Sequence, residues 1–76
     1  MNKHVLKDIL ENVKDSEEVV VKLDNETFIK ISRYSLEEDV AVLESDKYLY
    51  FIPYALIDYV CAKTEVQDER IDNEGL

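Results

Sequence analysis

Apolar residues recur every three or four positions near the start of the chain. Five residues follow this spacing: Val5, Leu6, Ile9, Leu10 and Val13. Charged and polar side chains fill the positions between them, so a helix formed here would carry one apolar stripe and one solvated face. The pattern predicts an amphipathic helix over residues 3–14, which Asp15 and Ser16 end.

Short runs rich in β-branched and aromatic residues make up the rest of the chain as far as Ala62. Such runs favour strands, and they cover residues 19–23, 27–34, 40–44, 48–52 and 55–62. In the second run, alternation places Ile29 and Ile31 on one face and Lys30 and Ser32 on the other.

The connections between these runs are short. Asp24-Asn25-Glu26 and Asp46-Lys47 have turn chemistry, and residues 37–39 form an acidic connection. Pro53 removes a backbone donor, so the chain must bend sharply between the last two runs. One helix followed by five antiparallel strands predicts a mainly β fold, a small and strongly bent sheet that closes into a barrel.

The stretch from Tyr48 to Cys61 is apolar on both faces of the expected strands. A 76-residue chain buries only about 60% of the surface that it exposes when unfolded, so one copy has too little interior to cover both faces. A bare apolar edge would also recruit partners at random. We therefore expect a second copy to cover it in a closed, symmetric assembly. The expected interface residues are Tyr48, Leu49, Tyr50, Phe51, Ile52, Leu56, Ile57, Tyr59 and Val60.

The chain is acidic, with a formal net charge of −9. Residues 65–76 hold five of the 18 acidic residues and one of the 9 basic residues, so 13 and 8 remain in residues 1–64. The composition predicts one folded domain over 1–64 and an acidic, disordered tail over 65–76. Because nucleic-acid affinity depends on Lys and Arg displacing counterions, this charge balance disfavours binding to phosphate backbones, and we expect no DNA partner.

The residues that catalysis and metal binding need are scarce. Cys61 is the only cysteine, His4 is the only histidine and Gly75 is the only glycine. They provide no disulfide, no cysteine-based metal cluster and no phosphate-cradling loop. We expect no enzyme activity, metal or cofactor. With no apolar run of membrane-spanning length and no signal-peptide pattern, we expect a cytoplasmic protein that does not contact a membrane.

Several segments occur where a known family has its motifs. Asp24-Asn25-Glu26 stands at the place of the first hairpin turn, residues 42–46 match the third strand and the turn after it, and residues 51–56 occupy the second motif, where Ala55 is retained. Over residues 3–62 the chain resembles the Sm-like family, particularly its bacterial Hfq-type branch of RNA chaperones. The resemblance implies a five-stranded SH3-like barrel (the Sm-like fold).

The resemblance also implies an assembly and a ligand. Sm-like proteins form rings of about five to seven subunits, in which the fourth strand of one subunit pairs with the fifth strand of the next, and many members bind single-stranded RNA around the pore. This chain differs from the family pattern at three places. Pro53 and Tyr54 replace a Lys-His pair, Glu38 and Asp39 stand where base-binding residues occur, and Ile31 replaces a glycine. The candidate RNA-binding residues are Tyr54, Pro53, Lys30, Lys22 and Asp39.

Two functions remain open. Tyr54 would stack a base or would be an interface aromatic whose hydroxyl bonds to the backbone. Lys22 and Lys30 would form a basic annulus in a ring or would serve as ordinary solubilising charges. The first hypothesis is a homo-oligomeric ring that binds single-stranded RNA in a regulatory or chaperone role. The second is an acidic ring that acts as a protein-interaction scaffold with little RNA affinity.

Overall fold

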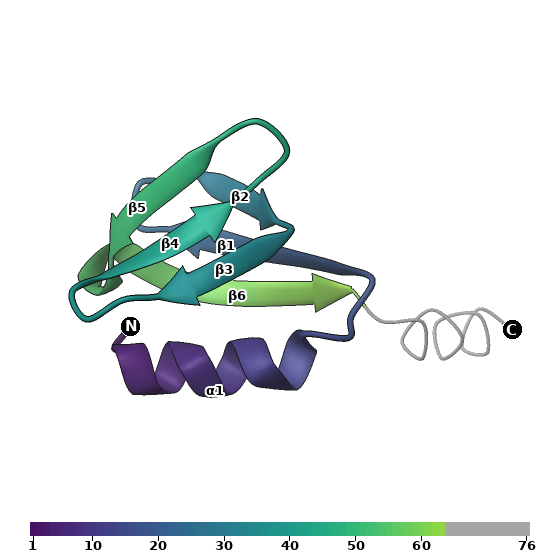
Figure 1. Ribbon diagram of the computed structural model, residues 1–76, viewed down its shortest axis with the longest axis horizontal. Coiled ribbons are helices and arrows are strands. Elements are labelled where there is room, and N and C mark those ends of the chain that lie inside the picture. The colour runs from purple at the N-terminus through teal and green to yellow at the C-terminus, as the bar shows by residue number, and fades with distance from the viewer. Residues whose placement is uncertain (64–76) are drawn as a thin grey trace, which may run out of the picture.

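The computed structural model describes residues 1–63, so the expected tail over 65–76 lies outside the described residues. The chain is mainly β, with one N-terminal helix (Figure 1). The elements are α1 (Lys3–Val13), β1 (Glu18–Leu23), β2 (Phe28–Ile31), β3 (Arg33–Leu36), β4 (Val40–Glu44), β5 (Leu49–Pro53), the 3-10 helix η1 (Tyr54–Leu56) and β6 (Ile57–Lys63). No helix within residues 1–63 has the length and apolar character needed to cross a membrane.

The strands form two three-stranded antiparallel sheets. The first has the order β2-β1-β6 and the second β3-β4-β5. Figure 1 shows α1 running along one side of the two sheets, past β3 and β6. The predicted helix is confirmed, and it begins at a cap in which the Asn2 side chain accepts a hydrogen bond from the Val5 N–H at 2.9 Å.

Ser32 separates the two sheets. Its N–H donates to the carbonyl of Glu44 at 2.8 Å and its hydroxyl donates to the same oxygen at 3.0 Å. The backbone thus stops pairing with β1 after Ile31 and begins to pair with β4 at Arg33. The run predicted as one strand over 27–34 is therefore two strands in different sheets, and over residues 1–63 the sheets do not close into a single five-stranded barrel.

The core lies between the inner faces of the two sheets and one face of α1. Leu6 and Leu10 of the helix are fully buried against Val21, Leu43 and Ile57. Burying a leucine of this size stabilises the fold by about 1.5–3 kcal/mol. Ile29 is buried and Lys30 and Ser32 are exposed, which confirms the predicted alternation.

A tight bend connects β5 to β6. The run predicted as a strand over 55–62 begins as a strand only at Ile57, because residues 54–56 form the 3-10 turn η1. The amino group of Met1 donates to the carbonyls of Tyr54 and Ile57, at 3.2 and 3.0 Å. These bonds fix the bend against the start of the helix.

Candidate functional site

Four strands lie at sheet edges in the described part of the chain: β2 and β6 in the first sheet, and β3 and β5 in the second. β5 pairs only with β4, and β6 pairs only with β1. No ladder joins β5 to β6 within one copy, although only η1 separates them in sequence. Each strand therefore has one side whose backbone groups have no strand partner, and such an edge is a template for another chain.

Alternation divides β5 between the core and solvent. Tyr50 and Ile52 point inward and pack against the core. Leu49 and Phe51 lie on the other face and are 54% and 62% exposed. The chain's own core thus covers one face of this apolar segment, and the other face is open.

The other expected interface residues divide in the same way. Ile57 is only 1% exposed and belongs to the core of its own chain. Its side chain packs inside its own chain, so a second copy would contact Ile57 only through its backbone. Val60 is half-buried against the same core. Tyr48, Leu56 and Tyr59 are exposed.

Three of the candidate RNA-binding residues lie at one end of the molecule. The hydroxyl of Tyr54 donates to the backbone carbonyl of Glu37 in the β3–β4 connection. Burial of the ring, followed by the negative charges of Glu37 and Asp39, raises the pKa of Tyr54. Pro53 stands opposite Val40 in the ladder. This end, defined by Tyr54, Pro53 and Asp39, carries the carboxylates of Glu37 and Asp39. The Met1 amino group also lies there, and it is bonded to the backbone carbonyls of Tyr54 and Ile57.

Lys22 lies elsewhere, on the outer face of the first sheet, and its charge is already paired. Its ammonium is 3.0 Å from the Asp58 carboxylate and 3.7 Å from Glu26, and its side chain is 11% exposed. It also lies 5.5 Å from the centre of the Tyr59 ring, within the range of a cation–π contact. The hydrogen bond to Asp58 raises the pKa of Lys22 more than its burial lowers it.

Lys30 shares that outer face, as the register shows. It stands opposite Val20, two residues from Lys22 on the same strand face. Unlike Lys22, Lys30 makes no ion pair among residues 1–63. It borders a shallow hollow with residues from the β4–β5 turn. The side chains that complete this hollow include Asp46, Lys47, Tyr48 and Tyr50.

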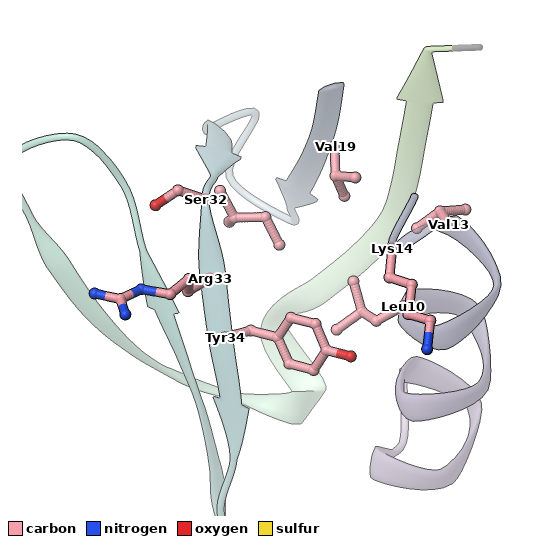
Figure 2. A pocket seen from close by; sticks show the side chains of 8 residues that line it. Leu10, Val13, Lys14, Val19, Ser32, Arg33 and Tyr34 are labelled. Atoms are coloured by element: carbon pink, nitrogen blue, oxygen red, sulfur yellow. The ribbon is translucent and has the colours of Figure 1, made fainter. Parts of the chain in front are cut away.

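A second hollow lies between the end of α1 and the bend at Ser32 (Figure 2). Its volume is about 300 Å³. The lining residues are Leu10, Val13, Lys14, Val19, Ile31, Ser32, Arg33 and Tyr34. We call it the helix cleft. Sequence patterns do not reveal the cleft, because its walls come from three segments that only the tertiary fold brings together.

Residues 1–63 contain no group of three or more His, Cys, Asp and Glu side chains placed to hold a metal ion. Comparison with protein-family models, with curated proteins and with solved structures finds no match to this chain.

Proposed function

We propose that this protein is a homo-oligomeric ring of the Sm-like type, in which β5 of one copy pairs with β6 of the next. The observation that carries this proposal is the pair of open edges on two consecutive strands. Each copy would offer two different edges, so the contact is head-to-tail, and such contacts produce rings when the rotation closes.

The strand order supports the finer fold assignment within this proposal. With β2 and β3 taken as one strand bent at Ser32, the order is β6, β1, β2–β3, β4, β5. That is the order of an Sm-like, SH3-like five-stranded barrel whose last two strands remain unpaired within one subunit. The bend occurs without a glycine, because Ser32 bonds twice to Glu44 instead.

We further propose that the ring binds single-stranded RNA. The basic and aromatic residues around Lys30 support this function: Lys47 and Tyr48 lie beside it, and the Tyr48 and Tyr50 rings are 6.0 Å apart. Aromatic faces beside cations are the usual platform for single strands. The acidic end around Tyr54 supports the alternative, a protein-interaction scaffold, because its carboxylates repel phosphate.

Sedimentation or native mass spectrometry tests the assembly. We expect a mass of several subunits for the folded protein. A mass of one subunit, under conditions where circular dichroism shows native structure, would refute the ring.

Titration of labelled oligo-U and oligo-A at low and moderate salt tests the ligand. We expect saturable binding that weakens with salt. A Lys30→Glu, Lys47→Glu variant should bind less tightly, and the matched control Lys7→Glu, on the exposed face of α1, should not. Tyr48→Ala and Tyr54→Ala then locate the stacking side chain. No saturable binding at tens of micromolar would favour the scaffold.

A further inference from the structure

The helix cleft has an apolar floor and walls. Leu10, at its base, is 1% exposed. Val13, Val19 and Ile31 are half-buried around it. The cleft lies at the end of the hydrophobic core, where α1 stops. The short side chains of Val13 and Val19 do not fill the space between the helix and the sheet there. Its volume of about 300 Å³ is at the lower limit for small-molecule sites.

The polar groups of the cleft are donors. In a chain with twice as many acidic as basic residues, the two charged residues that line the cleft, Lys14 and Arg33, are both basic. Arg33 is held by Glu44 at 3.1 Å, and Figure 2 shows its guanidinium pointing away from the cleft. Lys14 instead runs along the helix side of the cleft, and the Tyr34 hydroxyl points toward the helix from the opposite side (Figure 2).

This arrangement combines an apolar interior with one ammonium and one hydroxyl at the rim. A ligand that satisfies both needs an apolar body and a single anionic end. A carboxylate accepts hydrogen bonds from an ammonium and a hydroxyl together, and charge-assisted bonds of this kind are the stronger ones. The lining residues include no carboxylate that would repel it.

We propose that the helix cleft binds a small amphipathic carboxylate, with the acyl chain against Leu10, Val19 and Ile31 and the carboxylate between Lys14 and Tyr34. The site does not depend on the proposed ring. Its lining comes from α1, the inner side of β1 and the β2–β3 bend, and none of it from β5 or β6. Pairing through those two strands would therefore use none of the cleft's lining residues.

The test is a titration of the full-length ¹⁵N-labelled protein with octanoate, followed by amide chemical shifts. We expect saturable shifts centred on Val13, Lys14, Val19 and Tyr34, with a dissociation constant of about 1 mM for a ligand of this size. Octanol, which has the same chain without the charge, should bind roughly tenfold more weakly. Shifts centred on the exposed Leu49 and Phe51, or equal binding of octanol, would overturn the proposal.

Two substitutions test separately how the Lys14 charge and the volume of the cleft contribute to octanoate binding. Lys14→Glu should weaken octanoate binding by roughly tenfold or more, whereas Lys7→Glu, on the same helix but outside the cleft, should leave it unchanged. Val13→Phe fills the cleft and should abolish binding while the thermal midpoint stays the same or rises. Octanoate binding that survives Val13→Phe in a folded protein would show that the ligand lies elsewhere, and the proposal would fail.

Discussion

At the scale of single residues, Tyr54 joins two connections that are far apart in sequence. Its hydroxyl bonds the backbone of Glu37, so the β3–β4 connection is held against η1. The same bond uses the one proton of the hydroxyl, so Tyr54 cannot also donate to a phosphate oxygen. A contribution of Tyr54 to RNA binding would therefore come mainly from stacking of the ring.

Tyr54→Phe should lower the free energy of unfolding by roughly 1 kcal/mol, because the hydrogen bond is lost and the ring stays. Urea unfolding measures this change. The control is Tyr48→Phe, since the Tyr48 side chain is 64% exposed and its hydroxyl has no hydrogen-bond partner in residues 1–63. Equal stability of the two variants would contradict the role assigned to the Tyr54 hydroxyl.

Two raised pKa values predict a loss of stability at alkaline pH. The Asp58 hydrogen bond raises the pKa of Lys22 above 10.5, and burial raises the pKa of Tyr54 above 10.0. A group whose pKa is higher in the folded state stabilises the fold fully below its unfolded pKa, and this contribution disappears as the pH rises through the folded pKa. The free energy of unfolding should therefore fall above about pH 10.

Lys22→Gln tests the contribution of the Lys22–Asp58 pair. Its urea midpoint should depend less on pH than that of the wild type above about pH 10. Lys30→Gln, which removes an exposed lysine of the same sheet face, should keep the wild-type dependence. An unchanged slope in Lys22→Gln would show that the Lys22–Asp58 pair does not contribute.

Individual site residues were harder to predict than the strands that carry them. The sequence predicted that Lys22 and Lys30 share a face, and the register confirms it. It did not predict that Asp58, 36 residues away, neutralises Lys22. Pairings of this kind depend on the β1–β6 register, which alternation within one strand does not determine.

At the scale of the elements, the outer face of β5 is where the assembly prediction is most easily tested. Phe51→Lys should reduce the mass to that of one subunit without changing the circular dichroism spectrum. A lysine on an edge strand opposes pairing because its charge would have to be desolvated. Phe28→Lys is the matched control: Phe28 is 56% exposed on β2, at the opposite edge of the first sheet from β6. Assembly that persists in Phe51→Lys and fails in Phe28→Lys would place the interface on the first sheet instead.

Periodicity predicted the helix and the positions of the apolar runs because each depends on local alternation of side chains. It missed the break at Ser32, because the residue to which Ser32 is hydrogen-bonded, Glu44, is twelve positions away. It also missed η1, because residues 54–56 continue an apolar run that favours a strand. Tertiary contacts decided both boundaries.

At the scale of the whole molecule, assembly should not need residues 65–76. The strands proposed to pair end at Lys63, before the acidic segment begins. Deleting residues 65–76 should leave the number of subunits unchanged, as measured by native mass spectrometry. Dissociation into single subunits on truncation would show that the segment takes part in the interface.

The three-residue turn η1 has a consequence for the geometry of growth. Because it links β5 directly to β6, the dihedral angles of Tyr54, Ala55 and Leu56 would help to set the rotation from one copy to the next in the proposed assembly. A small change in that rotation, added once per copy, separates a circle that closes from a spiral that does not. In the proposed assembly, inserting one residue into this turn should therefore be enough to turn a closed particle into an open helical fibre.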